Sequence, residues 1–170
     1  EEGKGIKIIS PSYGGMSENV AFEYLTGASM NYFTKGYIPI MSLYRRAGIE
    51  NAPSVLKGFM NSGYSSEIIF ANDYYDSEKT YNKIGFEKFS ELVEKGESYI
   101  SDDESMNEII KRLETKGDKP LFCMLSTIEA HMPFTDERYE KYDVNIEKSS
   151  LSDNVNKVIK TYAQCIYNND

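Results

Sequence analysis

Ser17 has a chemically useful hydroxyl at a place where phosphate chemistry can occur. It follows Gly14 and Gly15 and opens a run with helical spacing, "SENVAFEYLTG" (17–27). A hydroxyl at a helix N-terminus lies beside backbone N–H groups that can receive phosphate, so Ser17 could act as a nucleophile. We expect no base beside it in the sequence. The competing interpretation is that Ser17 only caps the helix, a role for which serine is a preferred residue.

His131, the single histidine of the chain, lies in "STIEAHMPF" (126–134). It comes directly after the apolar run 120–127, which has the pattern of a buried strand. At the carboxyl end of a strand, an imidazole can donate a hydrogen bond to a phosphate oxygen or assist a leaving group. The alternative is a polar loop residue beside Pro133 with no chemical task.

Short apolar runs and helical stripes alternate along the chain. The runs 6–10, 67–70 and 120–127 predict strands. This alternation predicts an α/β fold with a mostly parallel sheet covered by helices. Ligands of such sheets gather at the carboxyl ends of the strands, which selects the loops containing Ser17, residues 71–78 and His131. The apolar positions at helical spacing are Val20, Ala21, Tyr24 and Leu25; Val55, Leu56, Phe59 and Met60; Met106, Ile109, Ile110 and Leu113; and Val155, Val158, Ile159, Tyr162 and Ile166.

Local signals mark where two of these helices begin. Pro53 fits the first turn of the helix that contains Val55. Ser101 or Asp103 can cap the helix that contains Met106.

Composition limits the class of protein. A chain of 170 residues with 40% apolar residues can bury one core, so we expect a single domain over 1–170. The net charge of −8 argues against nucleic acid as a partner. Two cysteines are too few for a disulfide scaffold. The chain begins close to the expected strand 6–10 and ends directly after an expected helix. We therefore expect it to be a truncated piece of a longer protein.

The segment "SYGGMSENVAFEYLTG" (12–27) resembles the nucleophile region of the lipoteichoic acid synthases and related phosphoglycerol transferases, within the alkaline phosphatase and sulfatase superfamily. Ser17 falls where that family has its catalytic threonine. Further segments keep the family's order, and the resemblance spans nearly the whole chain. They are "SVLKGFMNSGY" (54–64), "YNKIGFEKF" (81–89), "YISDDES" (99–105), "KPLFCMLSTIEAHMPF" (119–134) and "YAQCIYNND" (162–170).

The resemblance implies an alkaline-phosphatase-like three-layer sandwich, present here as a partial domain. It implies a metal-dependent transferase in which Ser17 is both nucleophile and metal ligand, with manganese as the expected ion and magnesium or zinc as alternatives. The hydroxyl would attack a phospholipid donor such as phosphatidylglycerol. The covalent intermediate would then pass phosphoglycerol to a glycan or polyol-phosphate acceptor. The parent protein is expected to be membrane-anchored, with this domain on the extracytoplasmic face of the bacterial cell membrane.

The resemblance also assigns His131 and Tyr75 to substrate binding. After residues 67–70 the relatives carry a His-Pro pair and an aromatic-Asn-Arg segment, where this chain has Phe70, Ala71 and then "YYDS" (74–77). An arginine that could contact phosphate through two hydrogen bonds is therefore missing from that segment. The family's other metal ligands correspond to positions outside residues 1–170. We therefore expect the isolated chain to bind metal weakly and turn over little.

Three alternatives remain open. The same nucleophile would serve a phosphoethanolamine or other phosphoglycan head-group transferase. A sulfatase-like hydrolase is a second alternative, but "SPSYGG" (10–15) lacks the Cys/Ser-x-Pro-x-Arg pattern of formylglycine sulfatases. The third is a non-catalytic binding or structural module, since the phosphate-binding arginine is missing and the metal site is incomplete.

Overall fold

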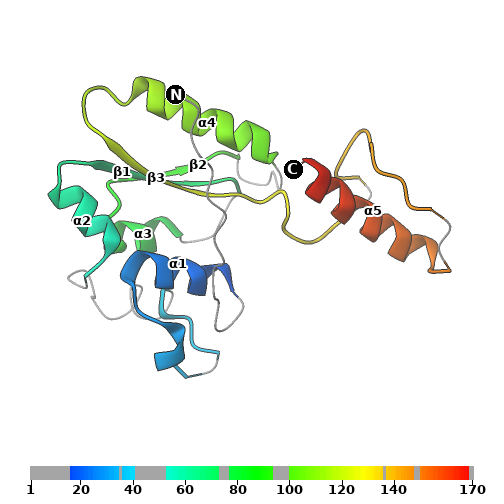
Figure 1. Ribbon diagram of the computed structural model, residues 1–170, viewed down its shortest axis with the longest axis horizontal. Helices are drawn as coiled ribbons and strands as arrows, with labels where there is room; N and C mark the ends of the chain where they lie inside the picture. Colours follow the sequence, from blue (N-terminus) through cyan, green and yellow to red (C-terminus); the bar gives the residue numbers. More distant parts are fainter. Residues whose placement is uncertain are drawn as a thin grey trace. The chain divides into compact units, whose positions relative to one another are not determined.

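The computed structural model describes residues 16–34, 36–40, 53–72, 77–93, 100–135, 137–147 and 150–168 (Figure 1). Helices and strands alternate along most of this part of the chain. In order they are α1 (Ser17–Thr26), the 3-10 helix η1 (Met30–Tyr32), α2 (Val55–Asn61), β1 (Ser65–Phe70), α3 (Ser77–Ile84), β2 (Lys88–Glu91), α4 (Asp102–Thr115), β3 (Leu121–Ser126) and α5 (Asp153–Asn168).

The three strands form one parallel sheet in the order β2-β1-β3. The Ser65 N–H donates to the Pro120 carbonyl and, further along both strands, the Ala71 N–H donates to the Ser126 carbonyl, each at 2.9 Å. Because both strands advance in the same direction between these bonds, the pair is parallel. The central strand β1 is buried along all but its first residue, as expected for a strand with neighbours on both sides. The expected α/β fold is confirmed.

The chain divides into two compact units. The first consists of Glu1–Ile68, Tyr74–Ser90 and Lys116–Met124. The second consists of Ile69–Asp73, Glu91–Thr115 and Leu125–Asp170.

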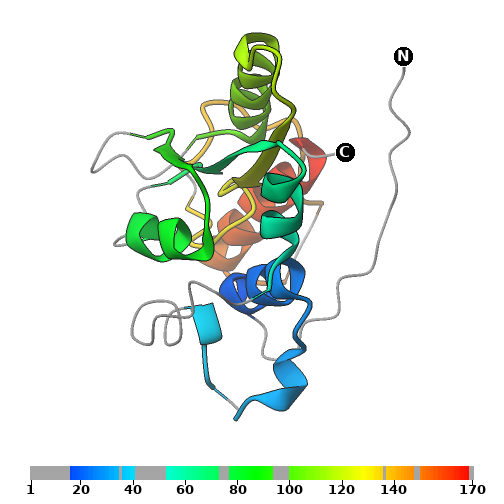
Figure 2. The ribbon, with the colours of Figure 1, turned by 90° about the vertical axis from the view of Figure 1, so that its left-hand side faces the viewer.

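An apolar cluster forms the core of the first unit. Leu25 of α1, Leu56 of α2 and Ile68 of β1 are fully buried. The Phe59 and Phe122 rings lie 4.8 Å apart between centroids. Figures 1 and 2 both show α1, α2 and α3 on the same side of β1. Full burial of one such side chain contributes about 1.5–3 kcal/mol, so this cluster is a principal stabilising feature of the unit.

A capping box begins α4 in the second unit. The Glu104 N–H donates to Ser101 Oγ at 3.2 Å, and the Ser101 N–H donates to Glu104 Oε2 at 3.1 Å. Hydrogen bonds from the Ser101 hydroxyl and backbone lower the pKa of Glu104. This reciprocal arrangement satisfies two backbone donors at the helix start. Of the two predicted caps, Ser101 is confirmed, whereas Asp103 lies inside the first turn.

Helix α2 begins at Val55, two residues later than expected from Pro53. Ser54 is the N-cap, and its hydroxyl accepts from the Lys57 N–H at 3.2 Å. Pro53 therefore precedes the cap rather than occupying the first turn, and that prediction is wrong.

The predicted apolar stripe of α5 is not the face that this helix buries. Its buried residues are Thr161, Gln164 and Cys165, which share a face at i, i+3 and i+4 spacing. Residues of the apolar stripe, by contrast, are 40–47% exposed: Val155, Val158, Ile159, Tyr162 and Ile166. Periodicity identifies side chains that share a face, but it does not identify what covers that face. Within the described residues, no helix is both long and apolar enough to cross a bilayer.

Candidate functional site

Ser17 is the first residue of α1 and is exposed to solvent. The N-cap is Met16, which has extended backbone angles and makes no side-chain capping bond. An N-cap residue precedes the helix and its side chain reaches back to the first-turn amides, whereas Ser17 is already helical. The interpretation of Ser17 as the cap is therefore wrong. Its hydroxyl is not used to satisfy the helix terminus.

The Ser17 hydroxyl contacts the carboxylate of the next residue, Glu18. Its Oγ donates to Glu18 Oε2 at 3.2 Å, and the Glu18 residue is only 8% exposed. A carboxylate within this distance can accept a proton from a hydroxyl. The expectation that no base stands beside Ser17 is thus wrong, because adjacent residues on a helix start can still meet through their side chains.

His131 lies in a turn just after β3. The backbone N–H of His131 donates to the Ile128 carbonyl at 2.9 Å, and the side chain of His131 is exposed. The imidazole Nδ1 lies 2.6 Å from the Met132 carbonyl oxygen. Because a carbonyl can only accept, this contact requires the proton on Nδ1. In neutral His131, Nε2 is then an acceptor, and it becomes a donor to phosphate only when the ring carries a second proton.

The remaining predicted site residue, Tyr75, lies outside the described residues. Ser17 belongs to the first compact unit and His131 to the second.

Among the side chains that the structure describes, no three His, Cys, Asp or Glu residues are grouped so that they could hold a metal ion. The described residues alone therefore do not fit a divalent-metal site, and Ser17 as a metal ligand remains a prediction.

A buried glutamate, Glu129, organises the turn that contains His131. Its Oε1 accepts from the Tyr139 hydroxyl and from Asn168 Nδ2, both at 2.8 Å. Its Oε2 accepts from the Asp102 N–H at 2.8 Å, and the residue is 2% exposed. A buried carboxylate is tolerated only when hydrogen bonds replace its hydration, as they do here. Glu129 thus joins the start of α4 to the end of α5.

Asp102 lies close to this carboxylate. Burial is the main cause that raises the pKa of Asp102, and the negative charge of Glu129 raises it further. Hydrogen bonds from the Glu129 backbone and the Thr127 side chain act in the opposite direction but do not cancel the rise. The Asp102 Oδ1 atom is buried without a hydrogen-bond partner. Ionised Asp102 is therefore less favourable in the folded protein than in water.

Asp102→Asn is expected to raise the free energy of unfolding near pH 7. A carboxyl whose pKa is higher when folded contributes stability below its unfolded pKa and loses that contribution as pH rises through the folded value. The gain should be less than about 1 kcal/mol, because solvent still screens this half-buried group. This gain in stability should shrink as the pH falls below 3.8, the ordinary pKa of an aspartate. Urea unfolding of both proteins across this pH range measures the difference, and a less stable variant at neutral pH would contradict the assignment.

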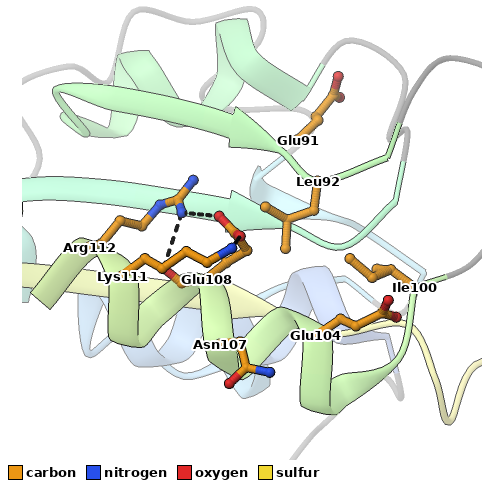
Figure 3. A pocket seen from close by; sticks show the side chains of 8 residues that line it. All are labelled: Glu91, Leu92, Ile100, Glu104, Asn107, Glu108, Lys111 and Arg112. Carbon is orange, nitrogen blue, oxygen red and sulfur yellow. Dashed lines mark hydrogen bonds and ion pairs between the residues drawn. The ribbon is translucent and has the colours of Figure 1, made fainter. Parts of the chain in front are cut away.

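A hollow of about 500 Å³ lies beside α4 in the second unit. Figure 3 shows Glu108 joined to Arg112, with Nη1 and Oε2 2.6 Å apart. Hydrogen bonds from Lys111 and then Arg112 lower the pKa of Glu108, so its charge is engaged within the helix. Neither Ser17 nor His131 lines this hollow, which therefore lies apart from both candidate site residues. Its lining residues are Glu91, Leu92, Ile100, Glu104, Asn107, Glu108, Lys111 and Arg112.

Two solved structures share the fold of this chain. The lipoteichoic acid synthase LtaP from Listeria monocytogenes superposes with a TM-score of 0.70 and 18% identity, over 94% of this chain and 38% of that one. A protein in the alkaline phosphatase superfamily from Vibrio parahaemolyticus gives a TM-score of 0.58 and 17% identity, over 89% and 37%. At these identities the similarity establishes the fold. The chain has the fold of the alkaline phosphatase superfamily.

Sequence comparison identifies the family. A curated relative from Rhizobium meliloti (strain 1021), named "Putative cyclic beta-1,2-glucan modification protein", is 31% identical over 168 residues. The match covers 95% of this chain and 25% of that relative, so the chain spans a quarter of the relative's length. The family model described as Sulfatase matches residues 4–170. The expected superfamily is confirmed, and the chain belongs to the sulfatase family.

Proposed function

We propose that this chain is part of a transferase that moves a phosphoglycerol-type head group from a lipid donor to a cell-envelope polymer. The observation that carries the proposal is that Ser17 begins α1 with a hydroxyl that does not cap the helix. Members of the sulfatase family, to which the chain belongs, are hydrolases or transferases. A hydroxyl at the place of the family's nucleophile fits covalent group transfer.

The proposed reaction has two displacements. Ser17 Oγ forms a bond to phosphorus while the bond to the diacylglycerol oxygen breaks, and the proton of Ser17 is balanced by one that diacylglycerol gains. Glu18 is placed to accept the first proton, because the Ser17 hydroxyl already donates to it. An acceptor hydroxyl then forms a bond to the same phosphorus while the bond to Ser17 Oγ breaks, and the proton that this hydroxyl loses is balanced by one that Ser17 Oγ regains. His131 and Tyr75 would bind the phosphodiester oxygens.

The acceptor is proposed to be a glycan. The Rhizobium meliloti relative carries a glucan-modification name, which supports a sugar hydroxyl over other nucleophiles. The proposed place of reaction is the extracytoplasmic face of the bacterial cell membrane, where donor lipid and polymer meet. A divalent metal, with manganese as the expected ion, belongs to the proposal. The described residues do not by themselves fit this metal, so its remaining ligands would come from other parts of the full-length protein.

The test is release of diacylglycerol from phosphatidylglycerol vesicles by the full-length protein that contains this chain. We expect release with manganese and an oligoglucan acceptor, and loss of release after chelation by EDTA. Release from phosphatidylethanolamine alone would identify a phosphoethanolamine transferase instead. A folded, metal-bound protein that releases product from neither lipid would contradict lipid head-group transfer, and one that binds no metal would support the non-catalytic alternative.

A further inference from the structure

Arg138 holds the backbone of the turn that contains His131. Its Nη1 donates to the Glu129 carbonyl at 2.6 Å, and its Nη2 donates to the His131 carbonyl at 2.8 Å and the Pro133 carbonyl at 2.9 Å. These three carbonyls alternate along the short stretch 129–133. One side chain therefore determines the path of the backbone on both sides of His131.

The guanidinium is itself held by its surroundings. The Phe134 ring centroid lies 5.3 Å from Arg138 Cζ, within the range of a cation–π contact. Cys165 Sγ, which is fully buried on α5, lies 3.6 Å from Nη1. The planar fork of arginine suits several carbonyls in fixed directions, whereas lysine offers a single compact ammonium. Arg138 is thus preorganised for this arrangement.

Arg138 does not replace the phosphate-binding arginine that the family pattern has after residues 67–70. Both of its terminal nitrogens already donate to backbone carbonyls at short distances. Binding phosphate with either would break a bond that shapes the turn. The contacts thus favour an indirect role.

We propose that Arg138 is a positioning residue, which fixes the 129–133 backbone so that the His131 imidazole is presented to the substrate in one orientation. The proposal deepens the proposed function and rests on it for the role of His131. The Met132 carbonyl that selects the Nδ1 proton lies within the same stretch. Loss of the arginine would therefore disturb both the position and the tautomer of the imidazole.

The experiment uses the single histidine of the chain as a probe, because its Hε1–Cε1 cross-peak needs no further assignment. Wild-type, Arg138→Gln and Arg138→Lys chains are compared, with Arg112→Gln as the control that removes a guanidinium from α4. We expect the cross-peak to move toward its unfolded-chain position in Arg138→Gln and less far in Arg138→Lys. Arg112→Gln should leave it in place. Titration with sn-glycerol 3-phosphate should show about tenfold weaker binding in Arg138→Gln.

An unmoved His131 cross-peak in folded Arg138→Gln would overturn the proposal. Should that variant lose its methyl dispersion and unfold, the folded Arg138→Lys chain decides in the same way. A cross-peak that moves while the wild-type chain shows no glycerol phosphate binding would support Arg138 as the organiser of the turn and count against the proposed function. The cross-peak therefore tests the positioning role of Arg138, whereas glycerol phosphate binding tests the proposed function.

Discussion

Ser17→Ala in the full-length protein is expected to lower kcat by at least about 10³-fold while leaving the fold intact. Removing the nucleophile of a covalent mechanism abolishes the chemical step and leaves only binding and electrostatic contributions. Stability should fall by about 1 kcal/mol or less, because the Ser17 hydroxyl is exposed and caps no amide, and its removal costs one hydrogen bond to Glu18. Diacylglycerol release and urea unfolding, measured on the same preparations, separate the two effects.

Two matched variants make this result specific. Ser17→Thr restores the residue type of the resembled family and should retain most of the turnover. Ser62→Ala removes an exposed hydroxyl from the end of α2, where it donates to the Gly58 carbonyl at 3.0 Å, and should leave turnover unchanged. Wild-type turnover in Ser17→Ala would remove Ser17 from the mechanism and leave the fold assignment untouched.

Glu129→Ala is expected to give the largest loss of stability, about 2–3 kcal/mol. The substitution removes the acceptor of the Asp102 N–H and of the Asn168 amide, and leaves the Tyr139 hydroxyl with Cys165 Sγ, a weaker acceptor at 3.0 Å. A donor that loses its partner away from water costs about 1–3 kcal/mol, and the exposed Asn168 amide can be rehydrated at little cost. Since whole domains are stable by only about 5–15 kcal/mol, this loss should be plain in urea unfolding followed by circular dichroism.

Glu137→Ala is the control for this substitution, because it removes an exposed carboxylate from the same connection and should change stability by less than about 0.5 kcal/mol. Combining Glu129→Ala with Tyr139→Phe should cost less than the sum of the two single effects, since both remove the same hydrogen bond. If the stability losses of the two single variants added up to that of the double variant, the bond between Glu129 and Tyr139 would contribute nothing to stability.

The sequence predicted two strands of the sheet and could not predict the third. Residues 67–70 and 120–127 are apolar runs, and β1 and β3 lie there. β2, by contrast, carries one apolar residue in "KFSE" and depends on its neighbour. Lys88 and Ser90 contact the buried Glu67 carboxylate of β1, at 3.0 and 2.8 Å. A strand that is held by polar contacts with residues distant in the sequence shows no alternation of apolar and polar residues from which it could be predicted. The predicted strand at 6–10 lies outside the described residues.

The candidate site was predictable only in part. Ser17 and His131 can be selected from residue type and place, because each follows a pattern expected at the carboxyl edge of a parallel sheet. Glu129 and Arg138 could not be selected, since their partners include Cys165 and Asn168 on a helix far along the chain. A usable signal does exist: polar residues at helical spacing on α5 indicate a face that packs against polar groups.

The bonds between Glu129 and α5 close a long loop. They join positions 36 and 39 residues apart, at Cys165 and Asn168. The entropy lost on closing a flexible loop grows only with the logarithm of its length, about 0.6 kcal/mol for each doubling. Residues can therefore be inserted into or removed from the connection before α5 at little thermodynamic cost, provided that the bonds from Glu129 to Cys165 and Asn168 are kept. In this part of the fold, the stability of the domain depends weakly on the number of residues in the connection and strongly on Glu129.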